Sequence, residues 1–178
     1  YLLYPNKERS SEDESALQAI LLSAFEKHDD TFLKKTLAEY YLQMNKRAGD
    51  VFVYYADYLI SGDNPMMNRT FGQWGGAAKQ LATAELVHLP KVQELFQYST
   101  KKKKSERRDA IRDMALESYR LIAAEIDNEV EFDQVVQSMK EIAEDGNTYV
   151  YRHLREFQDA FAERTYVPLA IKEIADMA

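Results

Sequence analysis

Apolar residues recur every three or four positions along much of this chain, which is the spacing of one face of an α-helix. In the first such segment, Leu17 and Leu21 lie four positions apart. Ser11 and Glu14 have the spacing of a capping box at a helix N-terminus. The pattern predicts a helix over residues 12–28.

A second apolar series follows Asp29 and Asp30, either of which can cap a helix. Its members form one predicted stripe: Phe32, Leu33, Leu37, Tyr40, Tyr41 and Met44. The series ends at the Ala48–Gly49 break, because glycine commonly terminates a helix. We therefore expect two antiparallel helices joined by a tight turn.

The segment VFVYYADYLI, residues 51–60, is ambiguous because valine, phenylalanine and tyrosine all favour strands. However, Phe52, Tyr55 and Leu59 lie at i, i+3 and i+7, and Gly62 stands where a helix would end. A lone strand would have no partner among the surrounding helices. The spacing favours a helix.

The second half of the chain shows the same periodicity. Helices are predicted over residues 77–89, 91–98, 105–127, 132–143 and 149–161, with a short one after Pro168. The stripe of the longest consists of Ile111, Ala115, Tyr119, Ile122 and Ile126. Together these elements predict an all-α bundle of seven to nine helices in one domain, residues 1–178. Two sub-lobes, 11–98 and 105–178 joined by a basic connector at 99–104, are the alternative arrangement.

Composition excludes several classes of function. Cysteine is absent, which removes disulfides, thiolate metal sites and a cysteine nucleophile. No apolar run approaches the roughly 18 residues that a membrane span needs, and a net charge of -7 disfavours binding to a membrane surface. The lack of cysteine and of a signal-peptide pattern near the first residue favours an intracellular protein, cytoplasmic, nucleoid-associated or nuclear.

One residue pair has metal-ligand spacing. Glu85 and His88 form an E-x-x-H pair like those of helical di-iron bundles, but such sites need a second pair and two further glutamates. Neither of the other histidines, His28 and His153, has a glutamate three residues earlier. The glycines of FGQWGG lack the Lys-Ser/Thr of a phosphate loop. We therefore predict no metal site, no cofactor and no catalytic residue.

Charge gives the strongest local signal. Residues 101–112 contain seven basic residues against Glu106 and Asp109. Lysine and arginine bind nucleic-acid backbones by neutralising phosphates and releasing counterions, and a nearby aromatic ring such as Phe96 can stack on an unpaired base. A helix extended backwards from 105 would place Lys101, Lys104, Arg108 and Arg112 on one face. The candidate nucleic-acid-binding residues are Lys101, Lys102, Lys103, Lys104, Arg107, Arg108, Arg112 and Tyr98.

The following segment, residues 121–146, has the opposite charge, with eight acidic residues and one lysine. A positive patch on one copy can meet the negative patch of the next, in a contact that builds rings or filaments. Tyrosine is also enriched where proteins dock. The candidate protein-interface residues are Glu125, Glu129, Glu131, Asp133, Tyr54 and Tyr58.

These features predict a non-enzymatic helical binding or assembly protein that engages a nucleic-acid backbone through its basic patch, as replication, packaging or nucleoprotein components do. The alternative is a protein–protein adaptor or regulator that self-associates and whose lysine run is only a solvated connector. A ligand-binding or metal-dependent helical enzyme is the third class. No sequence motif separates the three.

Overall fold

The computed structural model describes residues 10–61, 78–101, 106–144 and Phe157. Six α-helices lie within these ranges, and no strand does, so the predicted all-α class is confirmed for this part of the chain. They are α1 (Ser11–Lys27), α2 (Thr31–Met44), α3 (Asp50–Ser61), α5 (Leu89–Lys101), α6 (Glu106–Glu125) and α7 (Glu129–Glu144). The helices predicted over 149–161 and after Pro168 fall outside the described residues, apart from Phe157.

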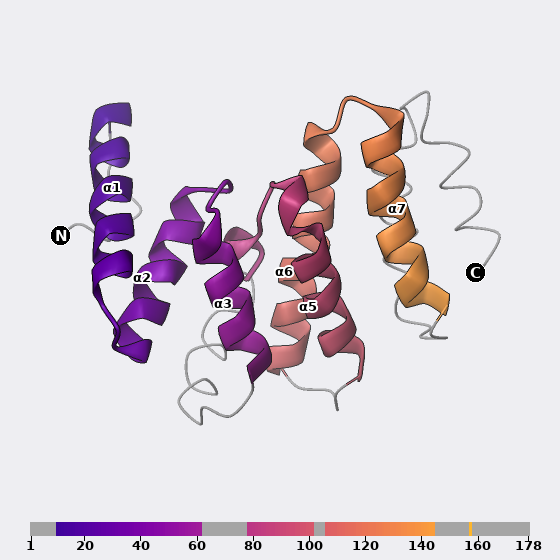
Figure 1. Ribbon diagram of the computed structural model, residues 1–178, viewed down its shortest axis with the longest axis horizontal. Coiled ribbons are helices and arrows are strands. Elements are labelled where there is room, and N and C mark those ends of the chain that lie inside the picture. The colour runs from indigo at the N-terminus through magenta and orange to yellow at the C-terminus, as the bar shows by residue number, and fades with distance from the viewer. Residues whose placement is uncertain (1–9, 62–77, 102–105, 145–156, 158–178) are drawn as a thin grey trace.

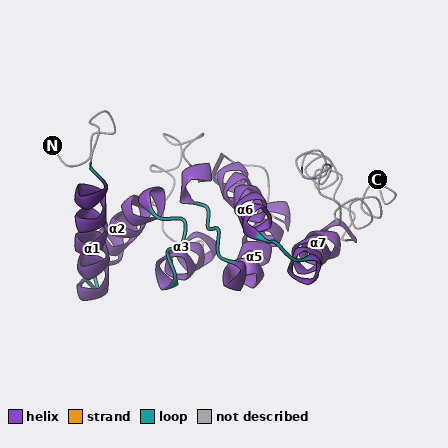
Figure 2. Ribbon diagram, turned by 90° about the horizontal axis from the view of Figure 1, so that it is seen from above, coloured by secondary structure: helices purple, strands orange, loops and turns teal. Residues whose placement is uncertain are grey.

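The helices stand in a row that runs from α1 to α7 (Figure 1). α1 packs against α2 as the predicted antiparallel hairpin, α2 packs against α3, and α3 packs against α5. α5 and α6 form a second hairpin, and α7 packs on both. Two short 3₁₀ helices, η1 (Ala78–Leu81) and η2 (Leu86–His88), lie before α5, and η1 packs against α2 and α6. Figure 2 shows the same row from above.

Side-chain caps fix where several helices begin. Ser10, Asp30 and Asn128 each accept a hydrogen bond from the backbone N–H three residues on, at 3.1, 2.8 and 2.9 Å. These bonds satisfy N–H groups that have no partner within the helix. The cap of α1 is therefore Ser10, one residue before the predicted Ser11, and of the two candidates for the cap of α2, Asp29 and Asp30, it is Asp30.

The ambiguous segment 51–60 is helical, as its spacing favoured. In α3 the buried residues are Val51, Phe52, Tyr55, Ala56 and Leu59. This set occupies one side of a helix, whereas a strand would bury alternate positions. Tertiary burial at a helical period thus overrides the strand propensity of valine and tyrosine.

The stripe predicted for the longest helix is buried as expected: four of its residues lie in the core face of α6, and Ile126 directly follows the helix and is buried too. Tyr119 lies at the centre of this stripe, with its ring against Phe96 of α5 at 6.0 Å between centroids. Its hydroxyl forms a hydrogen bond of 2.9 Å with Oγ of Ser138 in α7, and burial raises the pKa of Tyr119. One side chain therefore joins three helices.

The predicted stripe of α2 is wrong in part. Phe32 and Leu33 are 60% and 38% exposed, whereas Lys35 and Glu39 are buried. The two charges pair at 2.7 Å, and the Tyr55 hydroxyl donates to Glu39 at 2.8 Å. Charged residues can occupy a core position when they are paired and hydrogen-bonded in this way. Hydropathy alone does not identify such a pair.

The single helix predicted over 77–89 is also wrong. The chain there forms η1, then irregular backbone at residues 82–85, then η2. Pro90 is the second residue of α5 and not a stop, because proline is tolerated in the first turn of a helix. The N–H groups of Thr83 and Ala84 find partners elsewhere in the fold, so helical bonds are not needed to satisfy them.

The buried ion pair gives a testable prediction. Replacing Glu39 with Leu leaves the Lys35 ammonium buried without its counterion, so we expect urea denaturation to show a loss of about 3–5 kcal/mol in unfolding free energy. The double variant Lys35→Met/Glu39→Gln removes both charges and keeps an oxygen that accepts from Tyr55. It should match or exceed the parent. A double variant as unstable as the single one would contradict this role.

Candidate functional site

The basic run is divided between two helices. Lys101 is the last residue of α5, whereas Arg108 and Arg112 belong to α6, which begins at Glu106. Lys101 thus lies on a different helix from Arg108 and Arg112. Residues 102–105, which include Lys102, Lys103 and Lys104, are outside the described ranges. α5 and α6 run side by side (Figure 1), and in sequence the lysine run lies between the last residue of α5 and the first residue of α6.

The arginines of α6 are partly committed to internal contacts. The Arg112 side chain is 19% exposed, and its guanidinium lies 3.1 Å from Asp109 and 3.8 Å from Asp113. Arg108 is half-buried, and Arg107 lies in the first turn of α6. A phosphate would have to compete with two carboxylates for Arg112. Arg112 is therefore placed to stabilise the first turns of α6.

The aromatic residues before the run face inward to different degrees. Phe96 is completely buried against Tyr119, so its ring has no free face for a base. Tyr98 is half-buried and packs against the core. Of the two, Tyr98 alone remains a candidate contact.

The acidic candidates serve local roles. Glu125 pairs with Arg47. Glu129 and Glu131 lie in the first turn of α7, where negative charge interacts favourably with the helix dipole. Asp133 is exposed one turn later. The acidity of this segment thus has a structural explanation, while Glu129 and Asp133 remain accessible.

The two interface tyrosines line the core. The ring of Tyr54 meets Phe25 edge-on at 5.1 Å, and the Lys34 ammonium lies 5.3 Å from its centroid. Burial, followed by the nearby Tyr58 and Asp30, raises the pKa of Tyr54. Tyr58 is also half-buried against the core. Both positions fit tyrosines whose rings pack inward at the edge of the core.

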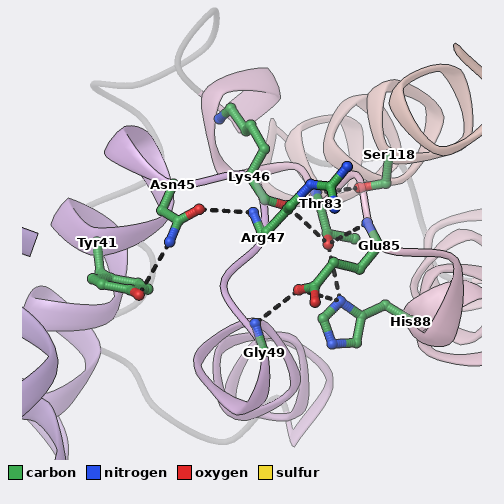
Figure 3. Close-up of polar contacts among 9 residues, drawn as sticks. All are labelled: Tyr41, Asn45, Lys46, Arg47, Gly49, Thr83, Glu85, His88 and Ser118. Atoms are coloured by element: carbon green, nitrogen blue, oxygen red, sulfur yellow. Dashed lines mark hydrogen bonds and ion pairs between the residues drawn. The ribbon is translucent and has the colours of Figure 1, made fainter. Parts of the chain in front are cut away.

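A set of buried and half-buried polar groups lies where the two halves of the chain meet, and sequence reasoning missed most of it. We call this the central polar cluster; it consists of Lys46, Gly49, Thr83, Glu85, His88 and Ser118 (Figure 3). The cluster joins the 45–49 turn, the irregular residues 82–85, η2 and α6. These elements are brought together only by folding.

Thr83 makes the largest number of contacts in the cluster. Its hydroxyl lies 3.3 Å from the Lys46 carbonyl and 2.9 Å from Nδ1 of His88, and it accepts from the backbone N–H of Glu85 at 3.2 Å. The backbone N–H of Thr83 donates to Oγ of Ser118 at 3.1 Å. The neighbouring N–H of Ala84 donates to the Lys46 carbonyl at 2.8 Å. Non-helical backbone is thereby satisfied inside the protein.

Glu85 and His88 are close, as their spacing suggested, but they face internal partners. Oε2 of Glu85 accepts from the Gly49 N–H at 2.8 Å and lies 3.5 Å from Nδ1 of His88. The His88 ring is 6% exposed and stacks on Phe52 at 5.1 Å between centroids. Burial lowers the pKa of His88, and Glu85 opposes this effect.

The cluster does not have the geometry of a catalytic triad. In a triad the hydroxyl and the carboxylate bond opposite nitrogens of the imidazole, whereas Thr83 and Glu85 approach the same nitrogen of His88. The described residues contain no group of three or more His, Cys, Asp or Glu side chains that could hold a metal ion.

Two basic side chains hold the outside of the 45–49 turn. The Lys46 ammonium donates to the carbonyls of Leu42, at 3.2 Å, and Gln80. Burial lowers the pKa of Lys46, opposed by the charge of Glu117. Arg47 pairs with Glu125 at the end of α6. The turn is therefore fixed to α2, to η1 and to α6.

No protein-family model, curated protein or solved structure matches this chain. Within the described ranges, no helix is both long enough and apolar enough to cross a membrane. Function is therefore inferred from the geometry of the protein alone.

The central polar cluster predicts that two substitutions lower the free energy of unfolding by different amounts. Thr83→Val keeps the shape of the side chain and leaves its buried polar neighbours short of a partner, so we expect a loss of about 1–3 kcal/mol in unfolding free energy. Arg47→Gln is the control, because the Arg47 side chain is 70% exposed. It should cost less than about 1 kcal/mol. Equal losses in chemical denaturation would refute the central role of Thr83.

Proposed function

We propose that this chain is a non-enzymatic helical binding protein that engages a nucleic-acid backbone through the basic residues where α5 meets α6. The single observation that carries the proposal is the hairpin itself. α5 and α6 pack closely along their lengths, and the chain passes between them through a run of lysines. A firm support that carries a dense set of cations is suited to a phosphate backbone.

A closely packed core holds α5 and α6 firmly together. Leu95 and Phe96 of α5 and Ile111 and Met114 of α6 are almost completely buried. Their packing fixes the two helix ends on either side of the lysines. The lysines themselves need no fixed geometry, because an ammonium group acts on phosphate as a compact point charge.

The charge of the whole protein supports a localised contact. The net charge is -7, although residues 101–112 hold seven basic groups and two acidic ones. A polyanion is repelled by the acidic surface and attracted at this end of the hairpin. Binding is therefore expected in one orientation and with strong salt dependence.

Arg112 has a different role from the rest of the basic run in this proposal. We assign phosphate contact to Lys101, Lys102, Lys103, Lys104, Arg107 and Arg108. Arg112 instead stabilises α6 through Asp109 and Asp113. The polar cluster supports a binding role over catalysis, since its side chains bond one another and the backbone.

A matched pair of variants tests the proposal. Lys103→Gln/Lys104→Gln should weaken binding equally for different sequences and reduce the slope of log affinity against log salt by about two. Lys27→Gln/Lys79→Gln makes the same change in net charge at two exposed positions and should leave the slope unchanged. Fluorescence polarisation with single- and double-stranded probes at several salt concentrations measures both. Equal slopes for the two variants would refute the proposal.

Self-association is the second candidate, favoured by the accessible acidic residues Glu129 and Asp133 beside Val130, which is 71% exposed. Sedimentation of the same variants distinguishes it. A parent that does not bind nucleic acid, with self-association lost only in the Lys103/Lys104 variant, would favour a contact between copies. If both variants match the parent in both assays, the lysine run is a solvated connector.

A further inference from the structure

One carboxylate oxygen in the central polar cluster lies close to two partners. Oε2 of Glu85 accepts from the Gly49 N–H at 2.8 Å, and the same oxygen lies 3.5 Å from Nδ1 of His88 (Figure 3). The first contact holds the 45–49 turn, and the second reaches a group that can gain a proton. Whatever changes the charge of His88 therefore acts on the contact that joins Glu85 to the turn.

We propose that the central polar cluster is a proton-sensitive latch, in which protonation of His88 releases residues 82–88 from the 45–49 turn. The proposal is independent of nucleic-acid binding. It makes the packing of α2 and α3 against the later helices dependent on pH.

Two effects oppose the protonated state in the closed latch. The imidazole is buried against the ring of Phe52, so a charge there loses its hydration. An imidazolium attracts Oε2 of Glu85, and because this oxygen also accepts from the Gly49 N–H, movement towards His88 strains the bond to the turn. Opening the latch hydrates the imidazolium and relieves this strain.

The charged groups around His88 do not cancel these effects. Glu85 on its own segment and Asp50 at the start of α3 favour the protonated form, yet burial outweighs them and lowers the pKa of His88. From the turn, Lys46 directs its ammonium to the carbonyls of Leu42 and Gln80. From α6, the cluster receives the neutral hydroxyl of Ser118.

The direction of the pH dependence follows from the lowered pKa of His88. A histidine whose pKa is lowered in the closed state stabilises that state fully above its ordinary pKa of about 6.5. This contribution is lost as the pH falls through the lowered value. The latch should therefore be closed at neutral pH and should open in mildly acidic solution.

Nuclear magnetic resonance on the whole chain tests the latch directly. The imidazole of His88 is titrated, and hydrogen exchange of the Gly49 and Ala84 amides, corrected for intrinsic rates, is followed from about pH 7.5 to about pH 5. We expect a pKa below the ordinary value. Protection of both amides should fall as His88 is protonated, by about tenfold for each unit by which the pKa is lowered. The amide of Leu21 in α1 serves as an internal reference.

Two variants separate the latch from general acid sensitivity. His88→Asn keeps a group that can bond Thr83 but does not titrate, so the acid-induced loss of protection should disappear. His28→Asn removes an exposed histidine at the end of α1 and should behave like the parent. A pKa of His88 at or above the ordinary value would overturn the proposal, and so would pH-independent protection of Gly49 and Ala84. The titration of the parent decides the matter even if His88→Asn does not fold.

Discussion

Two non-helical stretches of backbone satisfy each other's polar groups in the middle of this protein, and the arrangement of the helices depends on that match. The Lys46 carbonyl accepts from the Ala84 N–H, and the Gly49 N–H donates to Glu85, each at 2.8 Å. An unpaired buried backbone group costs about 1–3 kcal/mol, so neither stretch is stable there without the other. The match fixes α2 and α3 relative to η1, α5 and α6, and it thereby sets the position of the α5–α6 hairpin.

Local signals were sufficient to predict most of the helices. The stripe of α6 and the helical spacing of residues 51–60 depend on neighbours three or four positions away, and both predictions are confirmed. The failure at 77–89 has a different cause. That segment has helical spacing, but the Ala84 N–H bonds Lys46, 38 positions away, and the Thr83 N–H bonds Ser118, 35 positions away. No local pattern contains such partners.

The candidate site was less predictable than the fold. The E-x-x-H pair was visible in the sequence, yet its meaning depends on Gly49 and Thr83, which hold Glu85 and His88 in internal contacts. The charge pattern of the sequence reveals the basic run, but it does not show that Arg112 is paired with Asp109. Similarly, an aromatic residue beside a basic run suggests base stacking, whereas Phe96 lies in the core. Burial and pairing decide which charges and rings are available, and both are properties of the folded chain.

The Lys35–Glu39 pair gives the contact between α2 and α3 an unusual response to heat. Removing two charges from water is costly at room temperature, but the hydration of ions becomes less favourable as temperature rises, so the cost decreases. Apolar burial per unit area gains little over the same range. With its Tyr55 hydrogen bond in place, this contact should therefore strengthen relative to the purely apolar contacts on warming.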